Sequence, residues 1–272
     1  MLALALCSFL GLLAVMACAW LTQRALNNAG WIDVFWTFGT GATAVVLSLW
    51  PVSGPVNARQ ALVAVMAAAW SLRLGLYIAG RVARSPGEDR RYGDMRRLWG
   101  ADFQARLLPF VLIQAPVGWL LAAAIALAAR APWPAPTPSD LTPFDLLGAA
   151  ILVLAVGGET LADEQMRRFK ATSPPKDAIM DRGLWAWSRH PNYFFEWLSW
   201  IAYPVILMAH PAVYSLGWAA WGAPILMYLV LDHGTGVPPL EAAMLQSRGD
   251  AFRAYQSRTS RFFPWPPRKP SA

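Results

Sequence analysis

Long apolar stretches alternate with short polar segments along this chain, and that pattern predicts helices that cross a membrane. A helix needs about 20 mainly apolar residues to span the roughly 30 Å hydrocarbon core of a bilayer. Beyond the last such stretch, apolar residues recur at helical spacing between residues 240 and 255, as in an amphipathic helix. We therefore expect an all-α polytopic membrane protein with seven transmembrane helices and a short C-terminal amphipathic helix. The seven stretches are residues 2–21, 32–51, 60–80, 107–129, 144–161, 192–208 and 212–231.

The composition agrees with a membrane protein and divides the chain in two. Hydrophobic residues make up 56% of the 272 and charged residues only 14%, which is too apolar for an ordinary soluble domain. Residues 131–143 hold five prolines and predict a stiff connector. We expect a single membrane domain over residues 1–272, with a four-helix half (1–130) and a three-helix half (144–272). Glycines and prolines at 234–239 predict a break before the amphipathic helix.

The net charge of +7 is distributed in a way that predicts an orientation. Seven arginines fall between residues 81 and 106, six Lys/Arg between 167 and 189, and six after residue 232. With seven spans, the positive-inside rule places the amino terminus outside and the carboxyl terminus in the cytoplasm, in what we expect to be a bacterial inner membrane. The cations flank apolar stretches, so we expect contact with anionic membrane lipids and no nucleic-acid partner.

The cysteines and histidines indicate no metal or disulfide chemistry. Cys7 and Cys18 lie eleven residues apart in the first stretch, and we expect them to pack in the core. His190, His210 and His233 lack metal-ligand spacing, so we expect no metal.

Several predicted spans carry polar side chains near their cytoplasmic ends. In the third, Arg73, Tyr77 and Arg84 are spaced to line one stripe of a helix. Buried ion pairs that lock the helices together are the alternative for any one residue. Every carboxylate or guanidinium that we assign to a span lies in its cytoplasmic half, however, and this favours a ligand taken from the cytoplasm. The others in the set are Asp33 in the second stretch, Glu159 and Asp163 in the fifth, and Asn192 and Glu196 in the sixth.

The segment Arg-His-Pro-Asn-Tyr at residues 189–193 is the most informative motif in the chain. Together with Gly-Leu-Trp at 183–185, residues 236–241 and the tail 255–265, it resembles the bacterial membrane branch of the steroid 5α-reductase-like family. The resemblance extends upstream through Glu-Asp-Arg-Arg-Tyr at 88–92 and covers the chain from about residue 73 onward.

This resemblance implies an enzyme that uses NADPH to reduce a carbon–carbon double bond conjugated to a carbonyl in a lipophilic, steroid-like substrate. The four-helix half then faces the substrate and the three-helix half the cofactor. Cations that converge on one pocket suit the phosphates of NADPH, and an asparagine suits its carboxamide. The implied cofactor contacts are Arg73, Tyr77, Arg84, Asp163, Lys170, Asn192 and Tyr193, with Arg189 and His190 of the same motif.

The resemblance also implies an acid on the second helix and a tyrosine on the third, which share the task of hydrogen-bonding the substrate carbonyl. Asp33 occupies the first position, but Trp70 stands where the tyrosine is expected, and an indole cannot act as an acid at neutral pH. We therefore expect Asp33 to supply the proton, with Glu196 as the second candidate. Glu241 stays open between a cofactor contact and a helix cap.

Two other functions remain open at this point. Membrane methyltransferases of the isoprenylcysteine or phospholipid type carry a similar Arg-His-Pro-x-Tyr segment and bind S-adenosylmethionine, although that cofactor has no phosphate to require Arg73 and Arg84. A non-catalytic lipid-binding membrane protein is the other alternative.

Overall fold

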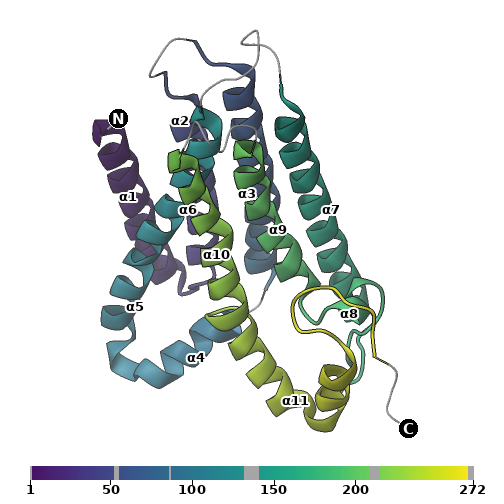
Figure 1. The fold of residues 1–272 in the computed structure, drawn as a ribbon. Helices are drawn as coiled ribbons and strands as arrows, with labels where there is room; N and C mark the ends of the chain where they lie inside the picture. The colour runs from purple at the N-terminus through teal and green to yellow at the C-terminus, as the bar shows by residue number, and fades with distance from the viewer. Residues whose placement is uncertain (1, 52–54, 86, 132–140, 209–214, 269–272) are drawn as a thin grey trace. The chain divides into compact units, whose positions relative to one another are not determined.

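The computed structural model describes residues 2–51, 55–85, 87–131, 141–208 and 215–268 (Figure 1). Most of the predicted proline-rich connector (residues 132–140) and His210 lie outside the described residues. Within them the secondary structure is helical, and the only β pairing is an isolated bridge between Ser188 and Ser260. The expected all-α class is confirmed. The chain forms two compact units: unit 1 comprises Met1–Leu147 and Tyr203–Ala220, and unit 2 comprises Gly148–Ala202 and Trp221–Ala272.

Helix α2 lies at the centre of unit 1, where it packs against α1, α3 and α6. The predicted fourth span is divided at Ile113, because Pro116 has no N–H to donate to Leu112 one turn earlier. The helices of unit 1 are α1 (Leu2–Leu26), α2 (Trp31–Leu49), α3 (Ala58–Arg84), α4 (Arg90–Trp99), the 3₁₀ turn η1 (Gly100–Asp102), α5 (Phe103–Leu112), α6 (Gln114–Arg130) and the first residues of α7 (Pro143–Ala171).

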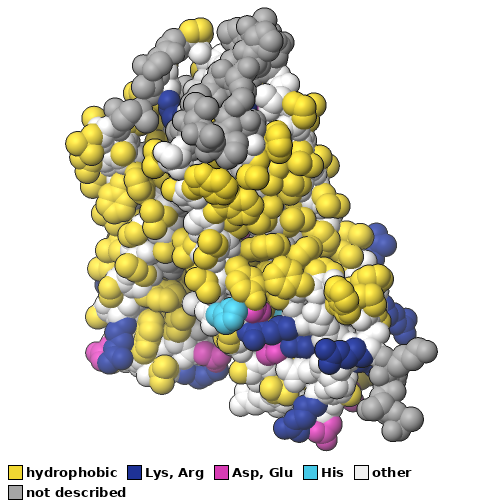
Figure 2. All heavy atoms as spheres, in the orientation of Figure 1, with side chains coloured by type: hydrophobic (Ala, Val, Ile, Leu, Met, Phe, Trp, Pro, Cys, Tyr) yellow, Lys and Arg dark blue, Asp and Glu magenta, His cyan; other side chains and the backbone are white. Residues whose placement is uncertain are grey.

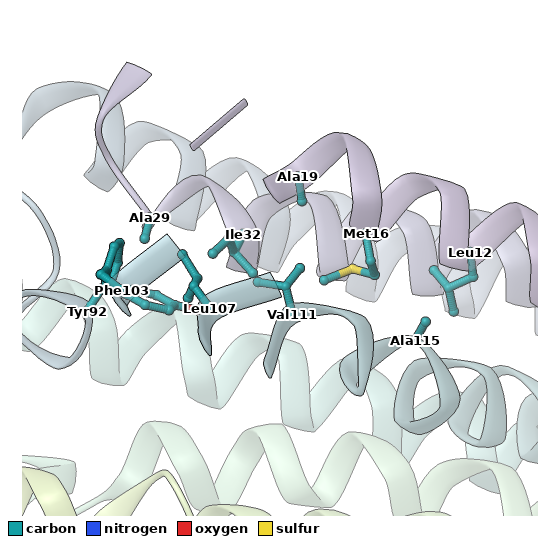
Figure 3. Close-up of a cluster of buried hydrophobic side chains, with 10 residues drawn as sticks. All are labelled: Leu12, Met16, Ala19, Ala29, Ile32, Tyr92, Phe103, Leu107, Val111 and Ala115. Atoms are coloured by element: carbon teal, nitrogen blue, oxygen red, sulfur yellow. The ribbon is translucent and has the colours of Figure 1, made fainter. Parts of the chain in front are cut away.

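A buried apolar cluster joins α1, α2, α4 and α5 within unit 1. Figure 3 shows Met16 of α1 pointing toward Val111 of α5, and both side chains are completely buried. Since fully burying one such side chain contributes roughly 1.5–3 kcal/mol, the cluster fixes α4 and α5 against α1 and α2. Its other members are Leu12, Ala19, Ala29, Ile32, Tyr92, Phe103, Leu107 and Ala115.

Small residues let α2 approach its neighbours closely, as the Gly-Thr-Gly-Ala-Thr-Ala run at residues 39–44 predicts. A Cβ atom added at Gly41 would lie 2.2 Å from the Ser71 side chain on α3. On α6, one added at Gly118 would lie 2.5 Å from Thr40 Oγ1. Neither position has room for a larger residue.

Unit 1 also contains an ion pair that the sequence interpretation missed. Arg59 lies just before the predicted stretch 60–80, in the first turn of α3, and is 1% exposed; its Nε donates to Asp145 Oδ1 at 2.6 Å. Asp145 is completely buried in the first turn of α7, at the opposite end of α3 from Arg84. The expectation that the charged groups of the spans are confined to their cytoplasmic halves was therefore wrong. Arg59 and Asp145 lie at the opposite end, where their charges neutralise each other.

Unit 2 contains the remainder of α7 and the chain around the Arg-His-Pro-Asn-Tyr segment. The predicted break before the last helix is confined to Gly234–Gly236, since proline is tolerated in a first helical turn and α11 starts at Val237. The elements of this part of the chain are α8 (Leu184–Trp187), α9 (Pro191–Leu207), η2 (Ser215–Trp221), α10 (Gly222–Tyr228), the π-helical turn η3 (Leu229–His233) and α11 (Val237–Arg258); the end of α9 and most of η2 belong to unit 1.

Five helical segments of the described chain are long and apolar enough to cross a membrane. They are Leu2–Leu26, Trp31–Leu49, Ala58–Arg84, Arg90–Arg130 and Pro143–Ala171. Figure 2 shows hydrophobic side chains over much of the drawn surface. Cys7 and Cys18 are exposed on α1, so the expectation that they pack in the core was wrong. They lie instead on a surface that a lipid-embedded helix would turn to the bilayer.

Candidate functional site

The predicted site residues divide between the two units. Unit 1 holds Asp33, Trp70, Arg73, Tyr77 and Arg84, whereas unit 2 holds Asp163, Lys170, Arg189, His190, Asn192, Tyr193, Glu196 and Glu241.

Asp33 accepts two hydrogen bonds from α4 within unit 1. Arg91 Nη2 donates to its Oδ2 at 2.5 Å, and the Tyr92 hydroxyl donates to its Oδ1 at 2.9 Å. Tyr92 is 3% exposed, so its phenol is shielded from bulk water. Both carboxylate oxygens of Asp33 therefore accept a hydrogen bond.

The chain before α4 holds this cluster in place. Asp89 caps α4 by accepting from the Arg91 backbone N–H at 3.0 Å, and Glu88 accepts from the Ala29 N–H at 2.9 Å. Burial by itself would raise the pKa of Glu88, but the hydrogen bonds from Arg96 and Ala29 hold that pKa below its ordinary value. Residues 88–92 carry the sequence resemblance, but their part in ordering the surroundings of Asp33 was not predicted.

The other four residues of unit 1 lie on α3. Trp70 is 1% exposed, whereas Tyr77 and Arg84 are exposed. Arg73 is half-buried, and its guanidinium carbon lies 5.4 Å from the centre of the Tyr77 ring, one helical turn away. Arg84 Nε donates to the Gly80 carbonyl of its own helix at 2.8 Å. Of the two cations in the predicted stripe, Arg73 therefore lies near the middle of α3 and Arg84 is its last residue.

Glu241 accepts hydrogen bonds from three side chains and lies at the centre of a hydrogen-bonded cluster in unit 2. It accepts from Arg189 Nε at 2.7 Å, from the His190 ring at 3.1 Å and from Gln256 Nε2 at 2.9 Å. Glu241 lies beyond the first turn of α11, so the helix-cap role is excluded; its partners are Arg189 and His190 before α9 and Gln256 farther along α11. Arg189 also donates to the Thr259 carbonyl at 2.7 Å.

The cluster determines the charges of its members. Burial by itself would raise the pKa of Glu241, but hydrogen bonds from His190 and Arg189 outweigh it and hold the pKa at about 2. Burial lowers the pKa of His190 in spite of the nearby Glu241 carboxylate. At neutral pH the cluster therefore combines a guanidinium, a carboxylate and a neutral imidazole, whose ring stacks on Tyr193 at 5.8 Å between centroids.

The carboxyl-terminal tail binds the segment that precedes α9. The Arg189 N–H donates to the Ser260 carbonyl at 2.8 Å, and the Trp265 N–H donates to the Trp187 carbonyl at 2.9 Å. The Ser188 hydroxyl donates to the Phe262 carbonyl at 2.8 Å. These bonds orient the residues at which α9 begins.

The remaining predicted residues of unit 2 differ in exposure. Asn192 is half-buried in the first turn of α9, and Lys170 is exposed at the end of α7. Asp163 and Glu196 are buried, and Glu196 accepts from Trp200 Nε1 one turn along α9 at 3.1 Å. Among the described residues, no group of three or more His, Cys, Asp or Glu side chains could hold a metal ion.

A family model described as a protein of unknown function (DUF1295) matches residues 19–259, and this family is a steroid 5α-reductase-like family. The matched range contains all the predicted site residues. No curated protein and no solved structure matches the sequence.

Proposed function

The chain belongs to the DUF1295 family, and we propose that it is a membrane enzyme that uses NADPH to reduce an enone in a lipophilic, steroid-like substrate. The observation that carries this proposal is the family match, which runs through both the Asp33 region and the Arg-His-Pro-Asn-Tyr segment. The bacterial membrane branch of the steroid 5α-reductase-like proteins is the part of the family that we propose for it.

We further propose that seven segments cross an inner membrane. Besides the five long apolar helices, α9 has 17 residues and is therefore roughly 26 Å long, close to the thickness of the hydrocarbon core. Residues 215–233 form consecutive 3₁₀, α and π turns, and we assign them to the seventh crossing.

The donor groups suit a dinucleotide that carries phosphates. In unit 1, Arg73 is a half-buried and Arg84 an exposed cation that suit a phosphate. In unit 2, Lys170 is an exposed cation, and the Asn192 side chain has both a donor and an acceptor for a carboxamide. Arg189, His190 and Glu241 satisfy one another, so we assign them to positioning Asn192 and Tyr193. When bound, NADPH would supply the hydride that adds to the β-carbon of the enone.

We assign protonation of the substrate to the Asp33–Tyr92 pair. As the hydride adds, negative charge develops on the carbonyl oxygen of the substrate and must be met by a hydrogen-bond donor. Trp70 replaces the tyrosine that the resemblance implies, and Tyr92 supplies a phenol beside Asp33 from a different helix. We propose that Asp33 holds this phenol in place, and that the phenol turns its single O–H to the substrate oxygen and transfers the proton there, leaving a phenolate that water reprotonates.

Cofactor binding and hydride transfer test the function directly. The purified protein is titrated with NADPH, NADH and S-adenosylmethionine, and NADPH deuterated at the transferred position is incubated with a panel of enones. We expect NADPH to bind and deuterium to appear at the β-carbon of a product. Tight binding of S-adenosylmethionine with none of NADPH would instead identify a methyltransferase, and binding of neither would leave the non-catalytic alternative.

Arg84→Ala and Arg81→Ala form a matched pair for the cofactor contact, since both arginines are exposed in the last turn of α3. We expect Arg84→Ala to weaken NADPH binding at least tenfold and NADH binding much less, because only NADPH carries the 2′-phosphate. Arg81→Ala should change neither. An equal loss for both cofactors would remove Arg84 from the 2′-phosphate.

A further inference from the structure

A pocket of about 280 Å³ lies beside the carboxyl-terminal tail in unit 2. None of the described residues that line it is acidic, and four of them are arginines. The lining residues with long polar, cationic or aromatic side chains are Arg189, Gln256, Arg258, Arg261, Trp265 and Arg268.

The carboxylates that pair with these arginines lie outside the pocket lining. Arg189 pairs with Glu241, Arg258 with Asp181, and Arg261 Nε with Asp232 at 3.0 Å. Three carboxylates thus balance three of the four arginines, which leaves one positive charge in excess. Among the described residues, no carboxylate forms an ion pair with the exposed Arg268 side chain. The guanidinium groups keep further N–H donors, because each carries five.

Backbone hydrogen bonds fix the wall of this pocket. The Arg268 N–H donates to the Arg258 carbonyl at 2.8 Å, which brings the two arginines together from the end of α11 and from the tail. The Trp265 N–H is held by Trp187 in the same way. Because the wall is fixed in advance, a ligand does not have to order the tail when it binds.

The chemistry of this lining matches a phosphate group. Arginine forks bind phosphate oxygens in pairs, and in a wall without carboxylates nothing repels an anion directly. Exposed aromatic side chains lie on the tail and on α8 beside it: Trp265 is 70% and Phe263 47% exposed on the tail, and Trp187 is 47% exposed at the end of α8. Aromatic rings beside arginines are typical of protein surfaces at the level of lipid head groups.

We propose that this pocket binds the phosphate group of an anionic ligand and that a phospholipid head group is the natural source. Its volume lies just below the roughly 300–1,000 Å³ of pockets that enclose whole small molecules, and this suits a head group whose lipid tails stay outside. The proposal does not depend on the reductase function. A soluble phosphate compound is the other source of the same chemistry.

Two probes separate these sources. Inorganic pyrophosphate is titrated by calorimetry into the full-length protein in neutral detergent. Phosphatidylglycerol retained by the protein from nanodiscs is counted by native mass spectrometry, with phosphatidylcholine nanodiscs as the reference. Arg268→Gln and the double variant Arg258→Gln/Arg268→Gln remove lining cations. Arg253→Gln is the matched control, because Arg253 is an exposed α11 arginine outside the pocket that pairs with Asp250.

We expect the double variant to lose about tenfold or more in affinity for the lipid, and Arg253→Gln to keep the parent affinity. Arg268→Gln alone should give a smaller loss with an unchanged melting temperature. Loss of pyrophosphate binding in the double variant would support the same pocket with a soluble source. If neither probe binds, or if the double variant and Arg253→Gln lose affinity equally, the proposal is wrong.

Discussion

At the scale of single residues, the two hydrogen bonds at Asp33 decide what its carboxylate can do. An isolated carboxylic acid could donate a proton, but Asp33 faces a guanidinium and a phenol and therefore accepts from both. The pair resembles the arrangement implied for steroid reductases in its chemistry, although the phenol comes from α4 and not from α3.

Asp33→Asn is expected to retain NADPH binding and to lower turnover by about 10²–10⁴-fold, the range for loss of a general acid–base group. Tyr92→Phe, which removes only the phenolic oxygen, is expected to give a loss of the same order. Single-turnover rates and their pH profiles measure both. A Tyr92→Phe enzyme with parental turnover would return the acid role to Asp33, and parental turnover in both variants would place the acid elsewhere.

Glu241 predicts how stability depends on pH. Because its pKa is about 2 in the fold against an ordinary 4.5, its contribution is complete above pH 4.5 and is lost as the pH falls toward 2. His190 adds a loss below its ordinary pKa of 6.5, since burial keeps it neutral in the fold. Glu241→Gln should destabilise the protein by about 3 kcal/mol at pH 7, because it leaves Arg189 buried without its carboxylate.

Thermal unfolding between pH 7 and pH 3 measures this prediction. The loss of stability between pH 4.5 and pH 3 should be smaller in Glu241→Gln than in the parent. Asp250→Asn is the control, since Asp250 is 95% exposed and should change neither stability nor its pH profile. If Glu241→Gln loses as much stability as the parent between pH 4.5 and pH 3, the low pKa assigned to Glu241 is wrong.

At the scale of elements, the tail after α11 acts as a strap across the start of α9. Its aromatic residues pack against the helices of unit 2: the Phe262 ring lies 6.2 Å from Trp197 and 5.3 Å from Tyr228. Backbone bonds at Ser260 and Trp265 complete the attachment.

Phe262→Ala should destabilise the protein by about 3–5 kcal/mol, as expected for an aromatic side chain that is 3% exposed. The neighbouring Phe263→Ala is the control, because Phe263 is 47% exposed and should give a much smaller change. Thermal unfolding in detergent compares the two. Equal effects would show that the strap is not anchored by Phe262.

The Arg59–Asp145 pair ties the start of α3 to the start of α7 within unit 1. Asp145→Asn should lower stability by about 3–5 kcal/mol, because it leaves a guanidinium buried without its carboxylate. Replacing both residues by apolar ones of similar size should restore much of the loss. Asp102→Asn, which breaks an exposed pair with Arg106, serves as the control in the same unfolding assay. A negligible change for Asp145→Asn would mean that water reaches the pair.

At the scale of the whole molecule, the proposed orientation can be measured with reporter fusions. A fluorescent protein fused after the last residue should be active in the cytoplasm, and alkaline phosphatase fused after Arg130 should be active outside it. These outcomes follow from seven spans with the cations on the inner side. Activity of both reporters on the same side would refute the count or the orientation.

The sequence by itself determined the helical class and most helix positions, because a bilayer forces every apolar stretch to satisfy its own backbone hydrogen bonds. It also predicted the close packing around Gly41, since small residues leave a signature in the sequence. The candidate residues could be named from motif and charge, but the partners of those residues could not.

Those partners were decided by the tertiary structure alone. Tyr92 lies 59 positions from Asp33, and Glu241 lies 52 positions from Arg189, so no local spacing links either pair. The same holds for Arg59 and Asp145, which lie 86 positions apart. Periodicity reports only which face a residue occupies on its own helix. Which carboxylate meets which guanidinium depends on how distant helices pack, and that packing fixes the charges available for chemistry.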